Sequence, residues 1–119
     1  MTVFNIFGTE SNFELPFYQF HRGQTIAVNK IVIEWYTSGT TVAGMISTDL
    51  IDKSPNNLRQ QICSFVKRHN ELVTEVNYPN PVFYKIQRQT MMDATITIES
   101  LFARKIPAVK SIFIQFITE

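Results

Sequence analysis

The sequence predicts an all-β protein built from short strands, and three observations lead to this fold class. Of the 119 residues, 35 are isoleucine, valine or threonine, whose branched side chains suit a pleated sheet better than a helix. The apolar residues fall into short runs separated by turn residues, which is the pattern of an all-β domain. Hydrophobic residues make up 45% of the chain and include ten phenylalanines, so the composition excludes a disordered protein.

The first two strands are expected at 2–8 and 13–20. Apolar side chains alternate onto both faces of the first: Val3 and Phe7 on one, Phe4 and Ile6 on the other. In the second, Pro16 cannot donate a ladder hydrogen bond, which makes this stretch an edge strand or breaks it there.

The third strand, expected at 25–37, has the clearest alternation in the chain. Three large apolar side chains alternate with a more polar set: Ile31, Ile33 and Trp35 against Lys30, Val32 and Glu34. One face of this strand is therefore expected to be buried. Residues 37–40 then predict a hairpin turn, with Gly39 available for a positive φ, and the fourth strand is expected at 41–51.

The segment after the loop at 52–57 is compatible with two structures. Several apolar residues have helical spacing, and Ser54 and Pro55 suit a helix start: Leu58, Ile62, Phe65, Val66 and His69. The run Ile62–Val66 also suits a strand. We favour a loop or short helical turn at 55–60 and a strand at 61–68.

The last three strands are expected at 71–78, 92–102 and 110–118, with an extended or looped stretch at 82–89. The final strand is apolar on both faces, as expected deep in a sandwich or at a subunit contact. Eight strands in this length fit a two-sheet sandwich, and the jelly roll is the eight-stranded form. The sequence thus predicts an eight-stranded single jelly-roll β-sandwich formed by one domain, residues 1–119.

Charge and segment composition exclude several classes of function. The chain has 11 Lys and Arg against 10 Asp and Glu, a net charge of +1, so no electrostatic footprint for nucleic acid is expected. No apolar run is long enough to span a membrane. The N-terminal residues lack the features of a signal peptide, so we expect a product that is made and assembled in the cell interior.

A search for catalytic, cofactor and metal sites predicts none. His21 and His69 do not adjoin a nucleophile elbow, and Asp49 and Asp52 lack the ligand series of a calcium loop. The isolated glycines form no phosphate-binding loop. We therefore expect no enzyme, no catalytic, cofactor-binding or metal residue, and no cofactor.

The remaining polar candidates are expected to be structural. The basic pairs Lys67-Arg68 and Arg104-Lys105 are interpreted as solvated loop residues, because the neutral total disfavours nucleic-acid binding. Cys63, the one cysteine, excludes an internal disulfide and is expected to pack as a small apolar residue.

The surplus of aromatic residues predicts an interface. One small sandwich cannot obviously enclose the N-terminal aromatics together with both faces of the last strand, and large apolar patches usually mark interfaces. A well-filled core is the alternative. The residues expected at a subunit interface are Phe4, Phe7, Phe17, Tyr18, Phe113 and Ile117.

The order of segments over roughly residues 25–119 resembles a known family. Five stretches carry the resemblance: Ile46–Ile51, Leu58–Val66, Glu75–Ile86, Ala94–Glu99 and Ser111–Phe116. Their order is similar to that of the C-terminal jelly roll of penton-type minor capsid proteins from polinton-like viruses, adintoviruses and virophages. The chain departs from the family at 102–108, which lacks the usual Asp and Gly, and it lacks the inserted domain of many penton proteins.

The resemblance implies a non-enzymatic structural protein that self-assembles in a virus-like particle, as a penton-like or minor capsid subunit located in the virion. It implies a homo-oligomer and contacts with other capsid proteins, without nucleic acid as a partner. Because of the departures, vertex, cement and fibre roles all stay open. The alternative is a jelly-roll binding module, lectin-like or tumour-necrosis-factor-like, or a fibre-head receptor-binding domain.

Overall fold

The computed structural model describes residues 2–14, 23–48, 60–86, 95–101 and 105–118. Within these ranges the chain forms nine strands and no helix. The strand bounds are β1 Thr2–Gly8, β2 Asn12–Glu14, β3 Thr25–Trp35, β4 Val42–Thr48, β5 Gln60–Lys67, β6 Val73–Asn77, β7 Tyr84–Lys85, β8 Thr95–Ser100 and β9 Val109–Thr118.

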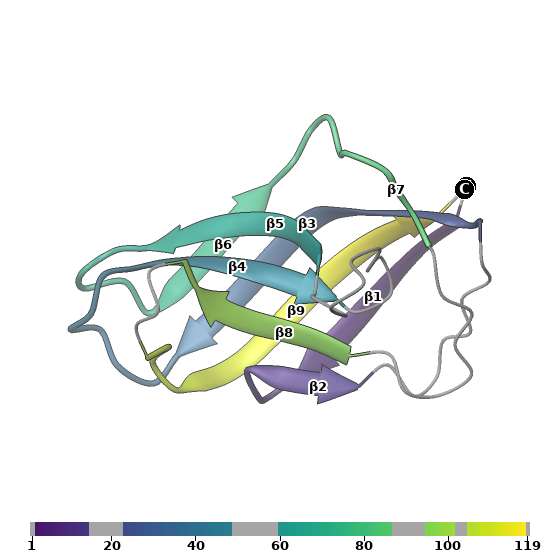
Figure 1. Cartoon of the computed structure of the whole chain (residues 1–119). Coiled ribbons are helices and arrows are strands. Elements are labelled where there is room, and N and C mark those ends of the chain that lie inside the picture. Colours follow the sequence, from purple (N-terminus) through teal and green to yellow (C-terminus); the bar gives the residue numbers. More distant parts are fainter. Residues whose placement is uncertain (1, 15–22, 49–59, 87–94, 102–104, 119) are drawn as a thin grey trace.

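The strands make two antiparallel sheets that pack as the two layers of a sandwich (Figure 1). One sheet has the order β1-β9-β3-β6, and the short β7 pairs with the start of β3. The other sheet has the order β2-β8-β4-β5. The all-β, sandwich-like class predicted from the sequence is therefore confirmed.

The strand pairing is nested. When β7 is left aside, the first strand pairs with the last, the second with the last but one, the third with the sixth and the fourth with the fifth. Most connections consequently pass from one sheet to the other.

Each of the eight predicted strands overlaps an observed one, and the ambiguous segment is a strand over the described residues 60–67. The two-residue β7 was not predicted as a strand. The expected continuation of the second strand to residue 20, the end of the fourth at 49–51 and nearly all of the loop or turn at 55–60 lie outside the described residues.

The hairpin turn predicted at 37–40 is wrong. β3 and β4 belong to different sheets, so this connection crosses the sandwich instead of reversing within one sheet. Gly39 does not have a positive φ; in the described part of the chain, Gly23 (φ 92°) and Asn70 (φ 66°) do.

The core lies between the sheets and is built by the predicted alternation. On β3, Ile31 and Ile33 are fully buried, and they pair in register with Ile114 and Ile112 of β9. Ile46, Ile96 and Ile98 of the other sheet complete the centre. Burying each such side chain contributes roughly 1.5–3 kcal/mol, so these side chains face the other sheet. Because side chains alternate along a strand, the opposite face of β1, β9, β3 and β6 is the outer surface of that sheet.

Candidate functional site

The outer face of the β1-β9-β3-β6 sheet carries an aromatic row. The register places Phe7 beside Phe113 and Phe113 beside Val32. The Phe7 and Phe113 rings tilt by 58° with centroids 5.2 Å apart, a geometry favourable for aromatic pairs. Phe7 nevertheless remains 75% exposed. The row is therefore an apolar surface with one exposed residue, Phe7, and two partly buried ones, Phe113 and Val32.

A polar row lies next to the aromatic row on the same face. Gln115 Nε2 donates to Asn5 Oδ1 at 3.0 Å, and Lys30 Nζ lies 3.8 Å from Glu75 Oε1. Asn77 Nδ2 also donates to Glu75, at 3.2 Å. Asn5, Gln115 and Lys30 thus border the apolar row on one side, as at the rim of a protein interface. The register places Glu75 beside Val32, at the β6 end of the apolar row itself.

On the other side of the aromatic row the surface is hollowed. An open groove of about 410 Å³ runs between β1, β9 and β3. Its walls include Phe113, Val32 and Ser111, and it holds one carboxylate, that of Glu34. Within the described part of the chain Glu34 forms no ion pair. The groove therefore joins an apolar wall to the carboxylate of Glu34.

The six residues predicted at an interface have different positions. Phe7 and Phe113 lie together on the outer face. Phe4 instead stacks on Phe116, with ring centroids 5.3 Å apart, and packs against the core, while Ile117 is 7% exposed. Phe17 and Tyr18 lie outside the described residues. The interface itself stays a prediction.

Sequence reasoning missed one member of the apolar row, Val32. Its signal was present, because Val32 alternates with the buried Ile31 and Ile33 and must face outward when they face inward. What the sequence lacked was the register that places Val32 beside Phe113.

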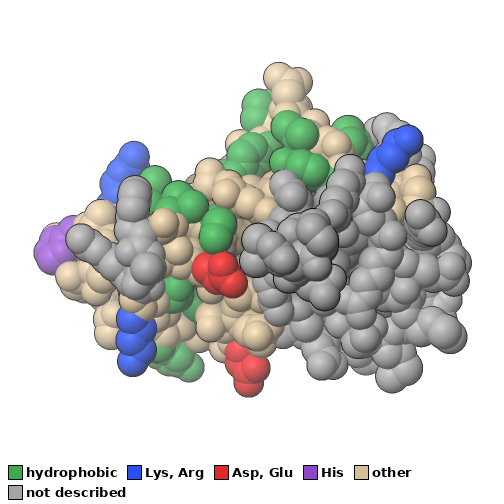
Figure 2. All heavy atoms as spheres, in the orientation of Figure 1, with side chains coloured by type: hydrophobic (Ala, Val, Ile, Leu, Met, Phe, Trp, Pro, Cys, Tyr) green, Lys and Arg blue, Asp and Glu red, His purple; other side chains and the backbone are tan. Residues whose placement is uncertain are grey.

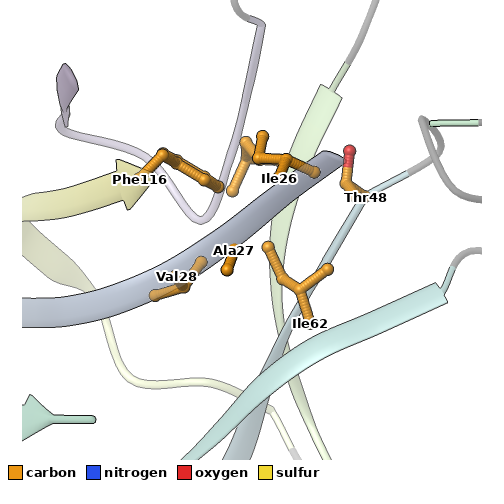
Figure 3. A pocket seen from close by; sticks show the side chains of 7 residues that line it. Ile26, Ala27, Val28, Thr48, Ile62 and Phe116 are labelled. Atoms are coloured by element: carbon orange, nitrogen blue, oxygen red, sulfur yellow. The ribbon is translucent and has the colours of Figure 1, made fainter. Parts of the chain in front are cut away.

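A hollow between the two sheets is too small for a ligand. It has a volume of about 10 Å³ and lies between β3, β9 and the facing sheet. Figure 3 shows Ile26, Ile62 and Phe116 among the side chains that surround it. A cavity needs about 10–15 Å³ and several polar partners to hold even one water, so this space is a packing defect in an apolar core.

A second hollow, of about 170 Å³, opens between β5 and the segment from β6 to β7. There the Tyr78 hydroxyl donates to the Ser64 carbonyl oxygen at 2.7 Å and accepts from the Ser64 amide at 3.3 Å. Burial raises the pKa of Tyr78. This hydroxyl ties the edge of one sheet to the other, which is a structural role.

The residues considered for catalysis or metal binding are not assembled into a site. His69 is exposed, and His21, Asp49 and Asp52 lie outside the described residues. Among the residues that the structure describes, no three His, Cys, Asp or Glu side chains gather as metal ligands. The described residues contain no helix that could cross a membrane.

The interpretation of Lys67 as a solvated loop residue is wrong. Lys67 ends strand β5, and its side chain is fully buried. Its Nζ donates to the Thr40 carbonyl oxygen at 2.8 Å and lies 5.8 Å from the centre of the Trp35 ring. Of the other basic residues considered, Arg68 and Lys105 are exposed, and Arg104 lies outside the described residues.

Cys63 is buried, as expected for a packed apolar residue. Burial raises the pKa of its thiol to about 12, and the thiolate is the reactive form. We expect a disulfide reagent such as 5,5′-dithiobis(2-nitrobenzoate) to label native protein at pH 7.5 at least 100-fold more slowly than urea-unfolded protein. Equal labelling rates in the two states, followed by absorbance at 412 nm, would contradict this placement.

Comparison of the chain with family models, with curated proteins and with solved structures finds no match.

Proposed function

We propose that this chain is a non-enzymatic structural protein, a single jelly-roll subunit of penton or minor capsid type that self-assembles in a virus-like particle. Its partners would be further copies of itself and other capsid proteins, in the virion. Three features support the proposal: the nested strand order, the exposed Phe7 of the apolar row and the resemblance of the segment order to penton-type capsid proteins.

The nested order supports a jelly roll. That fold arises when a long antiparallel ribbon is folded so that its eight strands divide between two four-stranded sheets. Pairing of first with last and inward to fourth with fifth is what such a ribbon produces, and β1–β9, β2–β8, β3–β6 and β4–β5 follow it. The added β7 is a two-residue extension beside β3.

The observation that carries self-association is the exposure of Phe7 at one end of the Phe7–Phe113–Val32 row. Covering a phenylalanine side chain contributes roughly 1.5–3 kcal/mol, and Phe7 is mostly uncovered within one chain. A second copy would supply that cover, and the adjoining polar row would form the rim of the contact.

One observation favours the alternative of a loop-presenting binding module or fibre head. Figure 2 shows hydrophobic side chains gathered over the segment between β6 and β7, where Val82 and Phe83 are exposed. Binding loops carried by a rigid sandwich are a common arrangement. In this function a ligand would contact these side chains, and the Phe7 row would not be needed.

The test is molecular mass by multi-angle light scattering and sedimentation equilibrium, up to about 1 mM because weak contacts need high concentration. We expect the wild-type mass to rise with concentration and Phe7→Ser to abolish the rise. Val82→Ser is the matched control, since Val82 is 63% exposed and lies between β6 and β7, outside the four strands of this face; it should behave as wild type. A wild-type chain that stays monomeric throughout would overturn self-assembly.

A further inference from the structure

The outer edge of β5 is occupied by a side chain from the other sheet. Among the described strands β5 pairs with β4 alone, and Figure 1 shows it at the rim of its sheet, beside the segment that leads from β6 to β7. The Tyr78 hydroxyl of that segment donates to the Ser64 carbonyl oxygen at 2.7 Å and accepts from the Ser64 amide at 3.3 Å. One hydroxyl thus engages both main-chain groups of a residue in the middle of β5.

These two main-chain groups are those that a further strand would use. In an antiparallel ladder the amide and the carbonyl of one residue point to the same side. Because the Ser64 amide bonds to Tyr78, both Ser64 groups point away from β4. The neighbouring pair, Ala43 with Val66, agrees. The Ala43 carbonyl oxygen accepts from the Leu101 amide at 2.9 Å, on the β8 side, so Val66 also directs its main chain to the outer edge.

Tyr78 is held in this position from several sides. Its amide donates to the Asn29 carbonyl oxygen at 2.8 Å, and its ring packs against the core. Pro79 follows directly, and a residue before proline is restricted to extended conformations. The contact with Ser64 is therefore preformed in the folded chain, and a competing strand has to displace it.

The sequence of β5 favours pairing with another strand. The stretch Gln61–Val66 has no charge, no proline and no glycine, and such segments add readily to other strands. Natural sheets protect their edges with bulges and with inward-pointing charges. In β5 a register shift lies near the start of the strand, and the buried Lys67 is an inward charge at its end. In the middle the protecting group is Tyr78.

We propose that Tyr78 is an autoinhibitory cap, which stops the edge of β5 from pairing with β5 of a second copy. A two-fold axis perpendicular to the sheet makes the two strands antiparallel, and an axis at Ser64 sets this residue opposite its own counterpart. As a hydrogen-bonded pair, the two Ser64 residues would exchange both main-chain bonds. Each copy must first give up the two bonds that Tyr78 makes. The cap does not depend on self-association through the Phe7 row.

Sedimentation equilibrium tests the cap in chains that all carry Phe7→Ser, so that the proposed apolar contact does not contribute. Adding Tyr78→Phe removes the hydroxyl and keeps the ring. We expect self-association to strengthen by roughly tenfold or more, because the edge is then competent to pair without first losing its own bonds. Tyr84→Phe is the matched control, since Tyr84 lines the same hollow beside β5, and it should leave the mass unchanged.

Charges placed at Ser64 test the pairing itself. Ser64 is exposed, and the two bonds of the cap use its main chain. In chains with Phe7→Ser and Tyr78→Phe, Ser64→Lys and Ser64→Glu should each abolish the association gained, because like charges directly opposite each other destabilise a strand pair. An equimolar mixture of the two variants should associate again, to within about threefold of the chain with Ser64.

The results are independent of the proposed function, because every chain carries Phe7→Ser. If Tyr78→Phe leaves the mass unchanged while its melting temperature shows a folded protein, the hydroxyl does not guard the edge and the cap is refuted. If Tyr78→Phe associates but neither charge at Ser64 reverses it, the new contact lies elsewhere and pairing of β5 edges is refuted. Recovery in the mixture establishes the pairing, because it requires the two residues at position 64 to lie opposite each other in different copies.

Discussion

Gly44→Ala will destabilise the protein by about 1–3 kcal/mol, the usual effect of forcing extra volume into a packed core. Gly44 on β4 lies directly opposite Phe65 on β5. A Cβ added at Gly44 would lie 2.9 Å from Cε1 and Cε2 of the Phe65 ring. The ring cannot simply move away, because Phe65 is buried and its centroid lies 6.0 Å from that of Trp35.

The matched control is Gly39→Ala. Nothing lies within 4 Å of a Cβ added at Gly39, and its φ is outside the left-handed region. We expect Gly39→Ala to be neutral or to stabilise by up to about 1 kcal/mol through the unfolded chain. Urea denaturation measures both changes in the free energy of unfolding.

A double variant tests the cause. If the Phe65 ring is the obstacle, Gly44→Ala combined with Phe65→Leu should lose less free energy of unfolding than the two single changes summed, as contacting residues do. Strict additivity, or a Gly44→Ala protein that unfolds with the wild-type midpoint, would show that Phe65 does not fill the space above Gly44.

The strands and the core could be predicted because their signal is local. Alternation with a period of two assigns Ile31 and Ile33 to one face of a strand and Val32 to the other, whatever the strand pairs with. The structure confirms this pattern. The two-residue β7 has no such signal, since it is too short to show a period and exists through pairing with Thr25 and Ile26.

The sheet assignments could not be predicted in the same way. Residues 37–40 have the composition of a hairpin turn, but β3 pairs with β6 and β9, which lie far along the sequence. Local turn chemistry does not encode such long-range pairing. The predicted hairpin was therefore wrong even though both flanking strands were correct.

The candidate site shows the same limit. Both faces of β1 are apolar, so sequence alone could not decide whether Phe4 or Phe7 points outward. The register with β9 decides it, because it sets Phe4 beside the buried Phe116 and Phe7 beside the outward Phe113. Two phenylalanines three residues apart thus have opposite environments.

For Lys67 the prediction from sequence differs most from the structure. Replacing Lys67 is also the second change for which we expect a large loss in the free energy of unfolding. A charged residue next to Arg68 suggested solvent, yet the Lys67 side chain is fully buried against Trp35. Trp35 is itself fixed, since its Nε1 donates to Thr74 Oγ1 at 2.9 Å and Thr74 donates to Glu71 at 2.7 Å. Lys67 therefore fills a space beside the Trp35 ring, whose position is fixed by these hydrogen bonds, at this end of the sandwich.

Lys67→Ala is expected to cost about 2–4 kcal/mol, because it leaves that space empty as other large-to-small core changes do. Lys67→Met keeps most of the stem. It removes an ammonium group that is buried without a carboxylate partner among the described residues. The several kcal/mol that desolvating such an ion costs offset the loss of its bonds to the two carbonyl oxygens. We therefore expect Lys67→Met to lie within about 1 kcal/mol of wild type.

Urea denaturation at pH 7 compares the two variants, with the exposed neighbour Arg68→Ala as the control expected within about 0.5 kcal/mol of wild type. The difference between the free energies of unfolding of Lys67→Ala and Lys67→Met separates the contribution of the side-chain stem from that of the charge. If Lys67→Met loses as much free energy as Lys67→Ala, the bonds from Nζ to the Thr40 and Arg68 carbonyl oxygens outweigh the cost of desolvating the ammonium group. If neither variant loses stability, Lys67 is solvated and its burial against Trp35 is refuted.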